Sequence, residues 1–167
     1  MSIRPILALG LLTAALAACA PAPGPIGAVS PSGAFREADF AWSANDGAAA
    51  INGQVDYRRD GQTYACVGSV GLTPDTPYTR ARFRTLYGST DRAAVPAAVV
   101  RARDIPDPNA NYRSYVRSTA CVDGRFSFTG LPDGGWFVIA PVTAGGAPLV
   151  LMRHVDTRGG RAVNITL

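Results

Sequence analysis

Few side chains in this chain of 167 residues have the type and spacing that catalysis or zinc binding requires. The single histidine is His154, and no H-E-x-x-H or G-x-S-x-G pattern occurs. Zinc sites usually combine several His or Cys ligands, and a serine nucleophile commonly lies on a glycine-flanked turn. We therefore interpret His154 as an ordinary strand residue and expect no enzymatic activity, no metal and no cofactor. Serine and aspartate are common enough here that a Ser-His-Asp set stays open as a third hypothesis.

Oxygen-bearing side chains gather in one short segment, at Asp104, Asp107, Asn109 and Asn111. Calcium is held by oxygen ligands of this kind. The spacing matches no known calcium-binding loop, and Asp, Asn and Pro are also the usual residues of turns. A plain loop is the favoured interpretation, and a calcium site is the alternative.

Arginine and aromatic residues alternate in the segment PYTRARFRTLY, residues 77–87. Tyrosine and arginine are frequent at interfaces. An exposed interaction surface would consist of Tyr78, Arg80, Arg82, Arg84 and Tyr87. The favoured alternative is a short helix with apolar residues at positions i, i+3 and i+4 packed inward and its arginines in water. Those inward residues are Phe83, Leu86 and Tyr87, and Gly88 is the expected end of the helix.

The chain carries a formal net charge of +4, and its sixteen basic side chains are all arginine. These arginines are scattered along the sequence, whereas a nucleic-acid interface needs them clustered on one face. We therefore expect no nucleic-acid partner and assign most of the arginines to the solvated surface.

The N-terminal segment has the pattern of an export signal. Arg4 gives it one positive charge, and residues 6–16 form an apolar run that is too short to span a bilayer. The sequence Leu16-Ala17-Ala18-Cys19 resembles the lipobox of bacterial lipoproteins. The resemblance implies that residues 1–18 are removed and that Cys19 is acylated, for example with palmitate. The alternative is an ordinary cleavage site beside a chance cysteine.

A tether follows the predicted lipid anchor. Residues 20–33 are rich in Pro, Ala, Gly and Ser and carry no charge, a composition that favours an extended conformation. We assign residues 19–34 to the lipidated N-terminus and tether, and residues 35–167 to one folded domain. Because Ala20 stands where an Asp would retain an inner-membrane lipoprotein, the resemblance implies an outer-membrane protein that faces the periplasm.

Two cysteines remain once Cys19 is assigned to the lipid, Cys66 and Cys121. The periplasm is oxidising, so a disulfide between them is the expected state. Two buried free thiols are the alternative.

The folded part is predicted to consist of short strands separated by Gly and Pro. Residues 58–61 and 131–135 are expected turns, and residues 92–111 are expected to be an excursion with a helical turn after Pro96. The expected strands are residues 51–57, 63–72, 125–129, 136–142, 148–155 and 161–167. Their apolar residues alternate, as in a β-sandwich.

The segment DGRFSFTGLPDGGWFV, residues 123–138, resembles the hairpin of the carboxypeptidase regulatory-like domain, and residues 51–55 resemble that family's first strand. The resemblance implies an antiparallel transthyretin/Ig-like β-sandwich. The short helix-containing insertion at residues 73–111, Cys66 and Cys121 depart from the family's general pattern. Phe126 and Phe128 would face the core, and Gly134 or Gly135 would supply a positive φ at the turn. The family's module is noncatalytic.

Three functions are compatible with these patterns. The first is a membrane-anchored structural or protein-interaction module of the cell envelope, whose partners are membrane lipid through Cys19 and an envelope protein. The alternative is a module that binds carbohydrate or peptidoglycan on exposed aromatic residues. Its candidates are Tyr112, Tyr115 and Trp136, although Trp136 is also an expected core residue. An enzyme is the least favoured.

Overall fold

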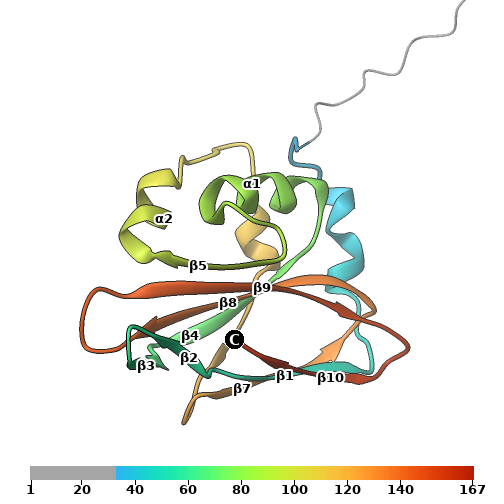
Figure 1. Ribbon diagram of the computed structural model, residues 1–167. Helices are drawn as coiled ribbons and strands as arrows, with labels where there is room; N and C mark the ends of the chain where they lie inside the picture. The colour runs from blue at the N-terminus through green and yellow to red at the C-terminus, as the bar shows by residue number, and fades with distance from the viewer. Residues whose placement is uncertain (1–32) are drawn as a thin grey trace, which may run out of the picture.

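The computed structural model describes residues 33–167, which form a β-sandwich with one helical layer (Figure 1). The predicted signal segment, Cys19 and nearly all of the tether lie outside the described residues. Within residues 33–167, no helix has the length and apolar character needed to cross a membrane. The mainly β architecture and its helical insertion agree with the fold predicted from the sequence.

The smaller sheet has three strands in the order β10-β1-β7. They are β1 (Ala49–Gln54), β7 (Arg125–Leu131) and β10 (Ala162–Thr166). β7 runs antiparallel to β1, whereas β10 runs parallel to it, so the sandwich is not antiparallel throughout. Ile51, Phe126, Phe128 and Ile165 are buried on its inner face, as the alternation predicts.

The larger sheet has seven strands and is organised around β8. One edge of β8 pairs with β9, which in turn pairs with β5, and the other edge pairs with β3 and β4. The strands are β2 (Tyr57–Arg59), β3 (Gln62–Cys66), β4 (Ser69–Pro74), β5 (Arg92–Pro96), β6 (Arg117–Ala120), β8 (Gly134–Thr143) and β9 (Leu149–Thr157).

The single strand predicted for residues 63–72 is wrong, because the chain leaves the ladder between β3 and β4 at Val67 and Gly68. The carbonyl of Pro141 on β8 accepts a hydrogen bond from Val67 N at 3.0 Å. In an antiparallel pair, the backbone N–H and carbonyl of one residue point to the same neighbouring strand. Pro141 has no N–H, so β8 cannot donate a hydrogen bond to the chain at Val67 and Gly68.

The two faces of β8 divide the core into two layers. Trp136, Val138, Ala140 and Val142 face the smaller sheet. The alternate residue Phe137 faces the helices, where it packs in a second cluster. That cluster contains Phe83, Leu86, Tyr87, Phe137 and Met152. The helices therefore cover the larger sheet on the side away from the smaller one (Figure 1).

The predicted helix is confirmed as α1 (Pro77–Tyr87). Thr76 and Thr79 form a reciprocal capping box, Pro77 occupies the first turn, and Gly88 at φ 74° ends the helix. The helical turn expected after Pro96 is α2 (Ala97–Arg103), but the excursion preceding it is partly a strand, β5. Residues 33–167 also contain three short 3-10 helices, at Glu37–Asp39, Ala41–Ala44 and Tyr112–Tyr115.

The prediction of positive φ at Gly134 or Gly135 is wrong. The segment that contains these glycines is also not a hairpin, because β7 pairs with β1 in the smaller sheet whereas β8 belongs to the larger sheet. The positive φ near this connection is at Gly130, at 66°. A Cβ on Gly134 would lie 2.2 Å from the Trp42 ring, so that glycine is needed because the indole packs against the backbone. The predicted disulfide between Cys66 and Cys121 is present, and it joins the end of β3 to the residue that follows β6.

Candidate functional site

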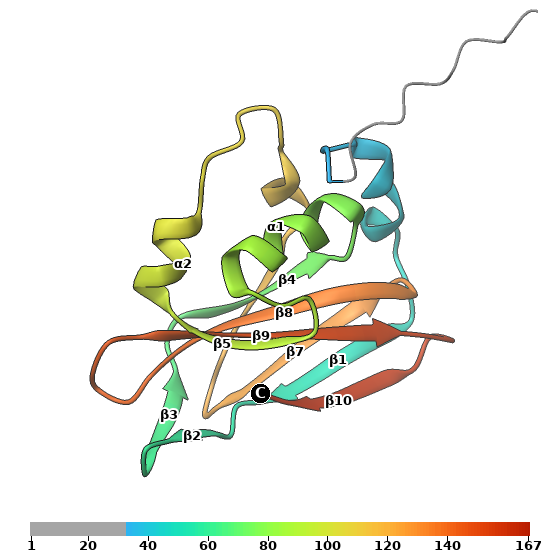
Figure 2. The same cartoon turned by 45° about the horizontal axis from the view of Figure 1, so that its top comes forward.

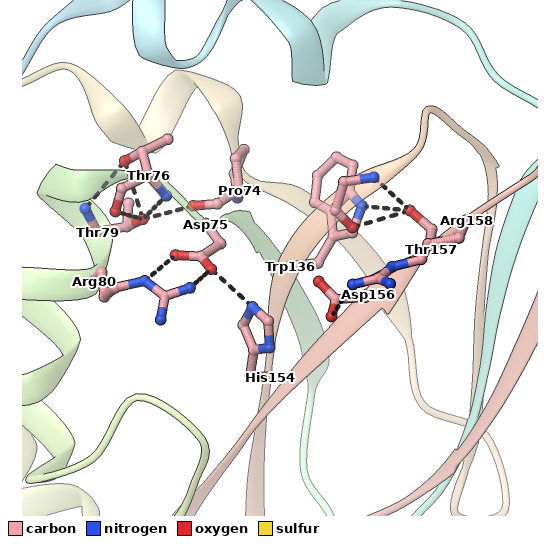
Figure 3. A network of polar contacts seen from close by, with 11 residues as sticks. Pro74, Asp75, Thr76, Thr79, Arg80, Trp136, His154, Asp156, Thr157 and Arg158 are labelled. Atoms are coloured by element: carbon pink, nitrogen blue, oxygen red, sulfur yellow. Dashed lines mark hydrogen bonds and ion pairs between the residues drawn. The ribbon is translucent and has the colours of Figure 1, made fainter.

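A network of polar side chains joins the larger sheet to α1 at the end of β4 (Figure 3). Asp75 lies between the sheet and the helix, and its carboxylate accepts hydrogen bonds from Arg80 Nε at 3.0 Å and from the Arg80 Nη2 group. Oδ2 of the same carboxylate lies 2.8 Å from Nε2 of His154 on β9. The Asp75 backbone N–H donates to the carbonyl of Gly135 on β8. Through its carboxylate and its backbone, Asp75 at the end of β4 thus contacts β8, β9 and α1.

The surroundings of Asp75 favour its charged form. Burial raises the pKa of this carboxyl, but the hydrogen bonds from His154 and Arg80 and their charges outweigh burial, so the pKa lies below its ordinary value. Gly135 leaves room for the pair, since a Cβ there would lie 3.0 Å from Asp75 and 3.1 Å from His154.

The hydroxyl groups near this network are used within the fold. Thr79 Oγ1 donates to the carbonyl of Pro74 at 2.6 Å and takes part in the capping of α1. Thr157 Oγ1 accepts from Trp136 Nε1 at 3.2 Å (Figure 3). The same hydroxyl donates to the carbonyl of Pro132 at 2.8 Å. These bonds hold the end of β4 and the predicted turn at residues 131–135, so we assign the network to the architecture.

The five residues predicted as an interaction surface do not share one exposed face. Tyr78 and Tyr87 are 4% and 8% exposed, so neither can contact a partner. Arg80 binds Asp75, and Arg82 binds Asp104 and the carbonyl of Ile105. Arg80 and Arg84 are both exposed, but Arg84 forms no ion pair within residues 33–167. The prediction of one surface made of all five is therefore wrong, because the helix turns its tyrosines inward.

The carboxylates of the segment considered for calcium already have partners within the chain. Asp104 forms ion pairs with Arg82 and Arg113. Asp107 accepts hydrogen bonds from the Tyr78 hydroxyl at 3.2 Å and from the backbone N–H of Asn109 at 3.0 Å. In residues 33–167, no three side chains of the metal-binding types gather around a common point.

The three aromatic residues considered for carbohydrate are also engaged. Trp136 is 0% exposed and Tyr112 is 9% exposed. Arg82 and Arg113 stack on the Tyr112 ring, with guanidinium carbons 5.3 and 5.8 Å from its centre. Tyr115 is half-buried and donates a hydrogen bond to Glu37. Trp136 and Tyr112 therefore offer no free aromatic face for a sugar ring, and the Tyr115 ring packs against Phe40 with centroids 4.8 Å apart.

A groove of about 650 Å³ opens where the edge of the larger sheet faces the smaller one. In Figure 2, β9 and β5 form this edge of the larger sheet, and β10 of the smaller sheet faces it. Leu151 of β9 and Leu167 after β10 contribute apolar surface. Tyr57 of β2 adds a half-buried aromatic ring, which packs edge-on against Tyr64 with centroids 5.4 Å apart.

The groove also carries three charged side chains, Asp56, Arg92 and Arg153. Arg153 donates a hydrogen bond to the backbone carbonyl of Thr166 at 2.6 Å. Asp56 lies 3.5 Å from Arg58. The groove therefore combines an aromatic ring, apolar walls and planar charged groups, a combination that suits a small polar ligand.

A shallower hollow of about 330 Å³ lies on the outer face of the smaller sheet and shares Thr166 with the groove. Its side chains include Asn52 and Asn164, whose amides lie 3.4 Å apart, and Ser127 donates to Asn52 at 2.8 Å. A ladder of neutral polar groups thus crosses all three strands beside the groove.

Sequence reasoning missed the groove, although one signal was present. The apolar residues of β9 alternate at Leu149, Leu151 and Val155, and Arg153 interrupts that series at an inward position. An arginine on the inward face of a strand indicates either a buried ion pair or an opening of the core to solvent. Arg153 forms no ion pair within residues 33–167, which leaves the opening.

Comparison with known proteins supports the fold. No family model matches the chain, and no curated protein matches it either. The structure is similar to the crystal structure of a proposed carbohydrate-binding protein from Pseudomonas aeruginosa, with a TM-score of 0.52 and 22% sequence identity. The match covers 80% of this chain and 97% of that one. The sandwich architecture is therefore shared with this solved structure.

Proposed function

We propose that this protein is a noncatalytic carbohydrate-binding module, anchored in the cell envelope by a lipid on Cys19. The groove beside Tyr57 carries the proposal, because it joins a ring-sized apolar surface to charged groups that can bond sugar hydroxyls. The name of the structurally similar Pseudomonas protein supports this choice. The structural or protein-interaction module, the first hypothesis from the sequence, has less support, because the interaction surface predicted for it contains two buried tyrosines.

The proposal extends to family and location. Phe126 and Phe128, in the segment that resembles the carboxypeptidase regulatory-like domain, are buried, as that resemblance implies. We therefore propose a divergent member of that family. The lipobox-like sequence ending in Cys19 and the Ala at position 20 support an outer-membrane anchor facing the periplasm.

The ligand test uses the mature full-length protein and purified peptidoglycan sacculi. Co-sedimentation with sacculi should be strong for the wild type, weak for Tyr57→Ala and largely retained for Tyr57→Phe. The phenylalanine variant keeps the ring and removes only the hydroxyl, so it is the matched control. Carbohydrate binding would be contradicted if the wild type neither sediments with sacculi nor binds any of a panel of soluble glycans in calorimetry.

The anchor is tested separately in cells. Labelled palmitate should be incorporated into the wild type and absent from Cys19→Ala, which should leave the membrane fraction because a protein without its acyl chains lacks the anchor. Wild-type protein that carries no label would overturn the anchor and leave the groove proposal standing.

A further inference from the structure

The two arginines of the groove occupy opposed positions in the sheet. Arg92 on β5 pairs directly with Arg153 on β9. Residues opposite one another in an antiparallel pair project from the same face, with Cβ atoms roughly 5 Å apart. Like charges at such positions destabilise a sheet. An arrangement that costs stability here indicates that the two charges serve a purpose outside the fold.

These arginines lie on the face of the larger sheet that looks toward the smaller sheet. Leu151 and Val155 flank Arg153 at alternate positions, and both belong to the core between the sheets. Across the neighbouring pair, Arg153 lies opposite Val138, which is 0% exposed. The Arg153 stem therefore runs through the apolar edge of the core, and its guanidinium reaches the groove.

The two charges lack an ion-pair partner among residues 33–167. Neither Arg92 nor Arg153 forms an ion pair there, and the one hydrogen bond from the Arg153 side chain goes to a backbone carbonyl. The carboxylate of the groove, Asp56, is paired with Arg58. Two guanidinium groups against one carboxylate leave the lining side chains with a net positive charge.

We infer that Arg92 and Arg153 bind the carboxylate of an acidic saccharide, whose sugar ring packs against Tyr57. This inference rests on the proposed function and names its ligand class. The fork of a guanidinium matches a carboxylate in two parallel hydrogen bonds, and such charge-assisted bonds are the stronger kind. A neutral sugar would leave the two neighbouring charges uncompensated, whereas one carboxylate relieves the repulsion between them.

Calorimetry of the mature full-length protein with matched sugar pairs tests the inference. The first pair is the disaccharide of N-acetylglucosamine and N-acetylmuramic acid against N,N'-diacetylchitobiose, which lacks the lactyl carboxylate. The second is digalacturonic acid against galactobiose. We expect at least one acidic member to bind about tenfold more tightly than its neutral partner, as one charge-assisted pair would give. That preference should shrink as salt is raised.

Substitutions identify the groups responsible. Arg92→Gln and Arg153→Gln should each reduce the acid preference, and Arg84→Gln on α1 removes the same charge elsewhere and should not. Arg92→Gln is the cleaner variant, because Arg153 also holds the Thr166 carbonyl. Equal binding of acidic and neutral members, or a preference that survives both groove substitutions, overturns the inference while carbohydrate binding stands. No binding of any member overturns the inference, and sacculus sedimentation then decides the broader proposal.

Discussion

Oδ2 of Asp75 lies 2.8 Å from Nε2 of His154, and this contact joins residues 79 positions apart in the chain. Asp75 follows the last residue of β4 and directly precedes Thr76, the cap of α1, while His154 lies on β9. The Asp75 side chain is 8% exposed and also binds Arg80. The contact therefore attaches the helical layer to the sheet through a mostly buried carboxylate.

Asp75→Asn should destabilise the fold by about 1–3 kcal/mol, the usual cost of weakening hydrogen bonds to a charged group. The amide retains the size of the side chain and removes its charge, so packing is preserved. Urea unfolding at pH 7 measures the effect. Asp56→Asn is the control, because that carboxylate is exposed and paired only at the surface, and its effect should stay within about 0.5 kcal/mol.

The contribution of the Asp75 charge should depend on pH. Its folded-state pKa lies below the unfolded value, which is about 3.9. The stabilisation is therefore fully present above the unfolded pKa and is lost as the pH falls through the folded pKa. The difference in unfolding free energy between wild type and Asp75→Asn should shrink between about pH 5 and pH 2. A constant difference over that range would contradict this account of the charge.

Much of the fold follows from local patterns. Thr76, Pro77 and Gly88 set the limits of α1, and the alternation at Phe126 and Phe128 identifies an inward face. These signals lie within a few residues of one another, so no knowledge of distant contacts is needed.

The features that the sequence did not predict depend on long-range pairing. Residues 92–96 contain two alanines and a proline, so their alternation is weak, and they form β5 because β9 offers an open edge. The opposition of Arg92 and Arg153 arises from that register. The partners of His154 likewise come from the end of β4, which no spacing rule connects to β9.

Removal of the disulfide should cost about 4 kcal/mol by loop-closure entropy, because Cys66 and Cys121 are 55 residues apart. The double variant Cys66→Ser/Cys121→Ser avoids leaving one reactive thiol. Its urea midpoint should fall strongly, and reduction of the wild type with dithiothreitol should lower the midpoint to a similar value. A reduced wild type as stable as the oxidised protein would show that the bond contributes little.

Phe83→Ala should loosen the helical layer from the larger sheet. Phe83 is 2% exposed, and its ring centre lies 4.8 Å from that of Phe137 and 5.3 Å from that of Tyr87. Truncation of a buried phenylalanine typically costs about 3–5 kcal/mol. Thermal unfolding checks the loss, and Arg84→Ala at the adjacent exposed position should change the stability little. Equal effects of the two substitutions would contradict the inward orientation of this helix face.

Gly53→Ala tests how closely the Phe126 ring of β7 packs over the central strand β1 of the smaller sheet. A Cβ on Gly53 would lie 1.9 Å from Cζ of Phe126, which is 5% exposed and opposite Gly53 in the pairing of β1 with β7. The ring must move into a filled core, so the variant should lose about 1–3 kcal/mol or more. Gly71→Ala in the middle of β4 is the matched control, because the nearest atom to its Cβ is 3.7 Å away. We expect it to be neutral or slightly stabilising, since alanine restricts the unfolded chain. If both variants unfold at the wild-type urea concentration, the Phe126 ring does not occupy the space above Gly53.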